Sequence, residues 1–339
     1  MRAILATPAL VDTELPEPVP GPHDLLVRIE AVAVNPIDTK LRAAVREGDP
    51  PRQLGWDAAG VVAAVGERVG RFRVGEAVIF AGDAGRAGCN AEAVLVDERL
   101  VGHRPARLSW AEAAVVPLTG LTAWEALFER LGLDPDAGAD VGAAGGGSSK
   151  GPSLLILGGA GGVGSIAIQL ARRAGAAVIA SASRPESAAW VRELGADHVV
   201  DHRRPLAPQL AALGFETVDR IANFSDTDAY WEVMAGLIAP LGSIVAIVGN
   251  RRPLDLNLLK AKSVTFAWEF MFSRSQFQTA DMGLQGEILD HLAELFERGE
   301  LRPTLGRTLS PINAANLEIA HAQLASGSTI GKIALVGWG

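Results

Sequence analysis

The chain has 339 residues, 48% of them hydrophobic and 21% charged, which is long enough for two soluble domains. Its 31 Lys and Arg against 39 Asp and Glu give a net charge of −8, which argues against a nucleic-acid or anionic membrane surface. Cys89 is the only cysteine, so an intramolecular disulfide and a four-thiolate zinc site are excluded. The first residues contain no sustained apolar segment, so we expect a cytoplasmic protein without a membrane span.

Residues 1–125 are expected to form a β-rich domain. Four short valine-rich runs bounded by Gly, Pro or Asp predict strands, at 25–34, 58–66, 76–82 and 90–97. Ser109 followed by Glu112 forms a capping box, which predicts a short helix that ends at Pro117. Helical periodicity over 122–131 then leads into a second domain.

The composition changes at 134–152, a stretch rich in Gly, Ala and Ser that we expect to be a mobile surface loop. After it, strand and helix patterns alternate, which predicts a parallel, doubly wound sheet in a domain spanning 126–270. Its expected last strand is 263–270, a possible edge for pairing with a second subunit. Residues 271–339 contain two amphipathic helices and a closing strand, and should return to the first domain.

The stretch SLLILGGAGGVGS at 153–165 carries the most specific chemical signal. Its apolar half is typical of a strand buried on both faces of a parallel sheet. The glycines that follow match G-x-G-x-x-G, which allows a tight turn, close approach to a pyrophosphate and close helix packing. A glycine-rich turn without a ligand is the alternative, but the flanking strand and helix favour a dinucleotide site. The predicted cofactor-binding residues here are Gly159, Gly161, Gly162, Val163 and Gly164.

The end of the next strand indicates which dinucleotide binds. NAD-binding enzymes place Asp or Glu about 20 residues after the last glycine, to hold the ribose 2′-hydroxyl. Here that position is Ser183, followed by Arg184. A hydroxyl and a guanidinium would bind a 2′-phosphate, so the sequence predicts NADPH rather than NADH. The alternative is that Arg184 is solvated charge at a strand end; four more arginines also follow strands, at 203, 204, 251 and 252.

Motifs along nearly the whole chain resemble the medium-chain dehydrogenase/reductase superfamily, and within it the zinc-free quinone-oxidoreductase branch. They are NPIDT at 35–39, GWDAAGVVAAVG at 55–66, LTGLTAWEAL at 118–127, GGAGGVGS at 158–165 and GKIALVG at 331–337. Segments such as LGADHVVDH and WEFMFSR are similar to a subgroup labelled zinc-type alcohol dehydrogenase-like proteins. The resemblance implies a GroES-like catalytic domain built from both chain ends, a Rossmann domain between them, and a homodimer or homotetramer.

The zinc of that label is not expected in this chain. The resemblance puts Asn35 in register with the first Cys ligand of the zinc-dependent members, and Trp56 replaces the His of their GHE motif. An amide is a poor zinc ligand beside a thiolate, and an indole is none. No thiol lies near Pro117, where the third ligand would be, so we predict no metal.

The resemblance also implies where substrate and nicotinamide would bind. Asn35 would lie near the nicotinamide, and Lys40 takes the place of a substrate-side tyrosine, where it would anchor or protonate an oxyanion. The alternatives are a solvated strand-end lysine for Lys40 and a core-packing role for Trp56, which would otherwise form an apolar wall. Asp38 and Asp57 are expected to hold loops. Further candidate cofactor contacts are Thr122, Asn223, Val248 and Phe270.

Together these features predict an NADPH-dependent reductase that transfers a hydride to a quinone or an α,β-unsaturated carbonyl. Such an acceptor delocalises the incoming charge and needs only hydrogen-bond donors, whereas an unactivated alcohol would need a Lewis acid. Two other functions stay open: a non-catalytic NADPH-binding sensor or scaffold, and a carbonyl or alcohol oxidoreductase.

Overall fold

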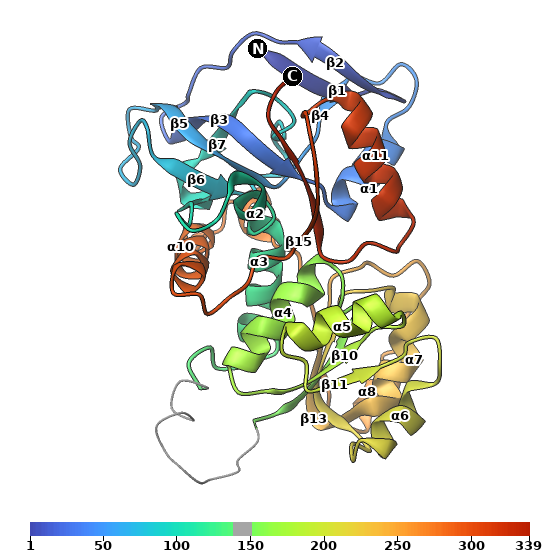
Figure 1. Cartoon of the computed structure of the whole chain (residues 1–339). Coiled ribbons are helices and arrows are strands. Elements are labelled where there is room, and N and C mark those ends of the chain that lie inside the picture. Colours follow the sequence, from blue (N-terminus) through green and yellow to red (C-terminus); the bar gives the residue numbers. More distant parts are fainter. Residues whose placement is uncertain (138–150) are drawn as a thin grey trace. The chain divides into compact units, whose positions relative to one another are not determined.

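A computed structural model describes residues 1–137 and 151–339 (Figure 1). Part of the expected loop at 134–152 therefore lies outside the described residues. The described chain forms two compact units: unit 1 is Met1–Leu121 with Met271–Gly339, and unit 2 is Thr122–Phe270. The chain passes into unit 2 once and returns once, so both chain ends belong to unit 1.

Unit 1 is built on two sheets. The smaller sheet has the order β2-β1-β4, from β1 (Arg2–Ala6), β2 (Leu10–Glu14) and β4 (Arg52–Gln53). The larger sheet contains β3 (Asp24–Ala33), β5 (Ala58–Val65), β6 (Ala77–Phe80), β7 (Ala93–Asp97), β8 (Val101–His103), β15 (Leu305–Leu309) and β16 (Lys332–Val336). Its order is β15-β16-β3-β5-β6-β8, with β7 also paired to β3. The four predicted strands are confirmed as β3, β5, β6 and β7, and β16 pairs antiparallel with β3, which joins the two chain ends.

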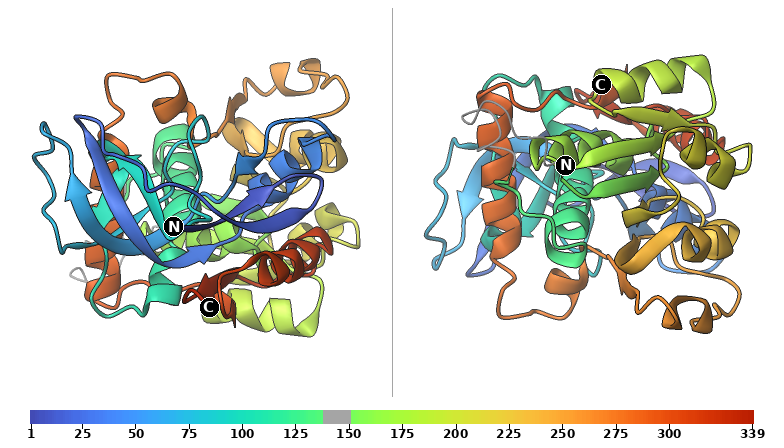
Figure 2. Two further views of the ribbon diagram at one scale, coloured as in Figure 1. Left: turned by 90° about the horizontal axis from the view of Figure 1, so that it is seen from above. Right: turned by 90° about the horizontal axis from the view of Figure 1, so that it is seen from below.

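The helices of unit 1 border these sheets. They are α1 (Pro36–Ala44), η1 (Glu98–Leu100), α2 (Trp110–Ala114), α9 (Ser273–Gln276), α10 (Leu284–Glu297) and α11 (Ala314–Ala325), and α3 (Pro117–Trp124) leads into unit 2. Figure 2 shows α10, in orange, alongside the strands of unit 1. It approaches β8 so closely that a Cβ at Gly102 would lie 2.4 Å from the Cβ of Leu289. Helix α1 was not predicted, although Pro36 at its first position is a typical helix start.

Unit 2 is a parallel sheet of the doubly wound type, as predicted. Its strands are β9 (Ser153–Leu157), β10 (Ala177–Ser181), β11 (His198–Val200), β12 (Val218–Asn223), β13 (Ile238–Ala246) and β14 (Thr265–Trp268). They lie in the order β11-β10-β9-β12-β13-β14, and every pair is parallel. The order reverses between β9 and β12, and doubly wound folds bind ligands outside the carboxyl ends of the strands at such a point.

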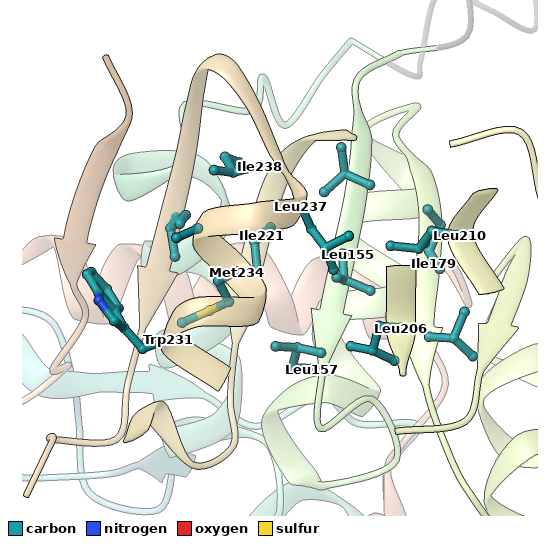
Figure 3. Packing of buried hydrophobic residues seen from close by; sticks show 14 of the residues in the cluster. Leu155, Leu157, Ile179, Leu206, Leu210, Ile221, Trp231, Met234, Leu237 and Ile238 are labelled. Atoms are coloured by element: carbon teal, nitrogen blue, oxygen red, sulfur yellow. The ribbon is translucent and has the colours of Figure 1, made fainter. Parts of the chain in front are cut away.

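The helices of unit 2 connect these strands. They are η2 (Glu125–Arg130), α4 (Gly162–Arg173), α5 (Pro185–Glu193), α6 (Leu206–Ala212), α7 (Thr227–Leu237) and α8 (Asn257–Lys260). Figure 3 shows α7 packing Met234 and Leu237 toward the sheet, beside Ile221. Leu154–Leu157 is completely buried, which confirms the predicted two-sided strand. Within the described residues, the helices are too short or too polar to cross a membrane.

Several element boundaries differ from the sequence prediction, and two of the differences have a clear local cause. The expected helix over 230–238 begins at Thr227, because the Asp226 side chain caps it by accepting a hydrogen bond from the Ala229 N–H at 2.9 Å. The expected strand over 263–270 is shorter, since Ser263 has a φ of 51°, which does not fit an extended strand. Strand β14 therefore begins at Thr265 and ends at Trp268.

Candidate functional sites in the two units

The glycine turn of unit 2 leaves no room for side chains on its inner side. A Cβ at Gly164 would lie 2.3 Å from the Gly158 carbonyl oxygen, and one at Gly159 would lie 3.0 Å from the Cβ of Ala180. A Cβ at Gly161 would meet nothing closer than 3.4 Å, so the fold alone does not require glycine there. An open backbone at the N-terminus of the twelve-residue helix α4 fits a bound pyrophosphate.

Polar groups gather where β10 and β11 end. The Ser181 hydroxyl, which was not predicted, accepts a hydrogen bond from the Gly158 N–H at 2.9 Å and so ties β10 to the glycine turn. The Arg203 guanidinium donates to the Ser183 carbonyl and pairs with Asp201 at 3.1 Å. Burial lowers the pKa of His202; the Asp201 charge opposes this shift, and the smaller effects of the Arg203 and Arg184 charges add to it. The structure therefore brings Arg184 and Arg203 to the same strand ends.

The two arginines that follow β13 have structural partners. Arg251 pairs with Asp226 at 2.6 Å and with Asp228 at 3.2 Å, near the start of α7. Arg252 donates from its backbone N–H to Asp228 at 3.2 Å. These contacts explain both residues as part of the loop that follows β13, away from the end of β10.

The predicted residues Asn223 and Val248 belong to one hydrogen-bonded network. The buried Asn223 accepts from the Ser225 N–H at 3.0 Å and donates to the Thr227 hydroxyl at 3.4 Å. Thr227 in turn donates to the Val248 carbonyl at 2.5 Å. Because Asn223 pairs in register with both Leu157 and Ala246, this network lies at the same sheet edge as the glycine turn. Sequence reasoning missed Thr227, which shows no motif of its own.

The two remaining cofactor candidates are at the ends of unit 2. Thr122 is buried in α3, at the point where the chain enters this unit. Phe270 follows β14, and 44% of its surface is exposed. Met271 and Phe272, which follow it in the chain, are both buried in unit 1.

Unit 1 contains a buried polar cluster centred on Lys332, which the sequence prediction missed. The Lys332 ammonium lies 2.7 Å from the Asp57 carboxylate, donates to the Val34 carbonyl at 3.0 Å, and contacts the Asn35 side-chain oxygen. The Asn35 amide donates to the same Asp57 oxygen at 2.9 Å. The sequence signal that could have indicated this cluster is Lys332 itself, the single charged residue at the start of the otherwise apolar segment GKIALVG.

The acidic members of this cluster hold backbone segments, as predicted. Asp38 accepts from the Asn35 N–H at 2.5 Å, and Asp57 accepts from the Leu118 N–H at 2.8 Å. Burial raises the pKa of Asp38 to about 7, opposed by the Asn35 amide and the Lys332 charge. Burial also raises the pKa of Asp57, and Lys332 and the hydrogen bonds oppose that shift.

Trp56 and Lys40 occupy different environments. Trp56 is 1% exposed, donates from its indole to the Asp83 carbonyl at 3.2 Å and contacts Phe272 edge-on, so it is packed in the core. Lys40 lies in helix α1 with an exposed side chain, so the alternative of a solvated strand-end lysine is right about the solvation and wrong about the strand end. The helix begins at Pro36, just after the strand that was predicted over 25–34.

The residues at the expected ligand positions do not fit zinc. Asn35 and Asp57 are bound to the Lys332 ammonium, whose charge would repel a cation. Burial raises the pKa of the Cys89 thiol far above its usual range, so it is not a thiolate. In residues 1–137 and 151–339, no three His, Cys, Asp or Glu side chains gather in a way that could hold a metal ion.

Comparison with known proteins identifies related sequences over both units. Residues 21–125 match the model of the alcohol dehydrogenase GroES-like domain, and residues 194–335 match the zinc-binding dehydrogenase model. A zinc-type alcohol dehydrogenase-like protein of Staphylococcus epidermidis is 41% identical over 94% of this chain and 92% of its own length. A chloroplastic quinone-oxidoreductase, QR1, of Triphysaria versicolor is 29% identical over 96% of this chain and 93% of its own.

Solved structures share the whole fold. A protein from Rhizobium etli, solved as a candidate zinc-dependent alcohol dehydrogenase, is 46% identical and superimposes with a TM-score of 0.91. The match covers 100% of this chain and 98% of the other. The predicted fold class, a Rossmann sheet with a GroES-like domain formed from both chain ends, is confirmed by these matches and by the sheet topology.

Proposed function

The chain belongs to the zinc-binding dehydrogenases of the medium-chain dehydrogenase/reductase superfamily, a family of oxidoreductases, and on this premise we propose a zinc-independent, NADPH-dependent reductase. Its proposed acceptors are quinones and α,β-unsaturated carbonyls. One observation carries the proposal: the dinucleotide turn is intact, while Asn35, at the expected first metal-ligand position, is bound to the Lys332 ammonium.

The residues of unit 2 support NADPH as the cofactor. Gly159, Gly161, Gly162, Val163 and Gly164 would hold the pyrophosphate at the start of α4. Ser183 and Arg184, joined by Arg203, would hold the 2′-phosphate, because two guanidinium groups favour a phosphate over a neutral hydroxyl. Thr122, Asn223, Val248 and Phe270 would contact the nicotinamide half. When bound, NADPH supplies a hydride from C4 of the nicotinamide.

The chemistry of the donor set supports an electron-poor acceptor. A quinone or enone spreads the incoming negative charge over its own conjugated system, so hydrogen-bond donors suffice to stabilise it. Asn35 would lie on the substrate side in unit 1, whereas Trp56 is packed in the core and is not part of the proposed site. Lys40 would protonate the product, and Lys40→Met should then lower turnover without changing NADPH affinity; unchanged turnover would assign the proton to solvent.

We also propose a homodimer or homotetramer in the cytoplasm. Strand β14 is one of the two edge strands of the unit 2 sheet, and Trp268 on it is 43% exposed. An edge strand with an exposed aromatic side chain is a typical place for pairing with a second subunit. Light scattering on the purified protein would give the mass; a monomer at micromolar concentration would contradict this part of the proposal.

The function is tested by anaerobic oxidation of NADPH and NADH with a panel of quinones, enones and aldehydes. We expect quinones or enones to be reduced, with NADPH preferred over NADH by at least about tenfold in kcat/KM. Reduction of aldehydes alone would instead favour carbonyl chemistry. Tight NADPH binding with no turnover on any acceptor would contradict the reductase and favour the sensor or scaffold.

A further inference from the structure

Two buried glutamates lie where the chain enters and leaves unit 2. Glu125 comes three residues after Thr122, the first residue of the unit, and Glu269 immediately precedes Phe270, the last. Their side chains interact, and the residues are only 1% and 2% exposed. Neither residue is used by the proposed reaction, so the pair requires its own explanation.

The local backbone positions this pair. Residues Glu125–Arg130 form a π-helical turn, which puts Arg130 on the same side as Glu125, and the Arg130 Nε lies 2.8 Å from the Glu269 carboxylate. The Glu269 N–H donates to the Ala246 carbonyl at 2.9 Å. Since Ala246 is in register with Asn223, Glu269 lies at the edge of the sheet that carries the proposed cofactor site.

The charges around the pair do not balance unless a proton is present. The pKa of Glu269 is raised to about 9, mainly by burial and then by the charge and hydrogen bond of Glu125. The Arg130 charge opposes this shift, and the Glu129 charge adds to it. Strands β13 and β14 carry no charged residue, and Arg220 of β12 donates to the Leu131 carbonyl instead. Glu129 also lies 3.6 Å from the Arg130 guanidinium, so one guanidinium cannot neutralise all the carboxyl groups near it. One proton shared by Glu125 and Glu269 removes the repulsion within the buried pair.

We propose that Glu125 and Glu269 are positioning residues whose shared proton fastens η2, which directly follows α3, to the end of β14 and so fixes Thr122 and Phe270 for the nicotinamide. This inference rests on the proposed function, because it takes both residues as cofactor contacts. At a pH below that at which the pair ionises, the proton bridges the two carboxyl groups. At a higher pH both carboxyl groups are charged, repel each other and release the two segments.

The test compares NADPH affinity across pH in the full-length protein, by fluorescence titration. For the unmodified chain we expect the Kd to rise about tenfold between about pH 7.5 and about pH 10, as the pair loses its proton. Glu269→Gln keeps a hydrogen-bond donor that cannot ionise, so its Kd should stay constant. Glu125→Gln makes the same test if the first variant does not fold. The matched control is Glu216→Gln, an exposed glutamate of unit 2, which should follow the unmodified chain.

A second readout is the stability without NADPH. Because the pKa of Glu269 is raised in the fold, the unmodified chain should lose stability relative to Glu269→Gln as the pH rises from about 4.5 to about 9. Above about pH 9 the difference in stability between the two proteins should stay constant. Equal pH dependence of NADPH affinity in the unmodified chain and Glu269→Gln would overturn the inference alone. Absence of NADPH binding at every pH would contradict the proposed function as well.

Discussion

The glycine turn of unit 2 and the Lys332 cluster of unit 1 are both tightly packed, but they are built in opposite ways. The turn depends on missing side chains within one stretch, 153–165. The cluster depends on side chains that are present, contributed by residues about 300 positions apart in the chain. The first kind of site can be read from a motif, whereas the second exists only once the sheet has formed.

The largest effect is expected from Lys332→Met, which removes the charge at the centre of the cluster. It leaves the buried Asp57 without its counter-charge, and should lower the free energy of unfolding by about 3–5 kcal/mol. Urea denaturation would measure it, with Lys40→Met as the control, since that exposed side chain should matter by less than about 0.5 kcal/mol. If Lys332→Met lowers the free energy of unfolding no more than Lys40→Met does, the cluster contributes little to stability.

A smaller effect is expected where a side chain is added to the turn. Gly164→Ala would bring a methyl group within 2.3 Å of the Gly158 carbonyl oxygen, so the turn must shift. We expect NADPH affinity to fall by about 100-fold, or about 2.7 kcal/mol. Gly236→Ala is the matched control, because a Cβ there meets nothing within 4 Å and helix α7 favours alanine. Unchanged affinity in Gly164→Ala would contradict a pyrophosphate site at this turn.

The smallest effect concerns the 2′-phosphate. Arg184→Ala should weaken NADPH binding by about tenfold and leave NADH binding unchanged, because only the phosphate loses a partner. Arg192→Ala, an exposed arginine on the same helix, should affect neither cofactor. Titration of each variant with NADPH and NADH measures the ratio. An equal loss for both cofactors in Arg184→Ala would place the arginine elsewhere than at the 2′-phosphate.

The sequence was sufficient to predict the fold class, because its signals are local. The apolar run Leu154–Leu157 and the glycines after it specify a buried strand and a tight turn through neighbouring residues. The Rossmann sheet and the strands of the GroES-like domain follow from such patterns. Element ends were less predictable, since they depend on single caps such as Asp226.

The candidate site was only partly predictable, because long-range pairing decides its charges. Lys332 gave no sign in the sequence that it would meet Asn35 and Asp57, since β16 and β3 must pair first. The alternative interpretation of Lys40 placed it at a strand end, because the helix start at Pro36 was overlooked. The π-helical turn that brings Arg130 to Glu269 has no known sequence signature here either.

The central claim is hydride transfer from NADPH without zinc, and one measurement tests it most directly. The purified chain is dialysed against a strong chelator, its zinc content is determined by elemental analysis, and NADPH oxidation with a quinone or enone is measured anaerobically. The account predicts an undiminished rate with less than about 0.1 zinc per chain, because the side chains around Lys332 do not suit the metal. Loss of the rate on chelation, with recovery on adding zinc, would contradict it.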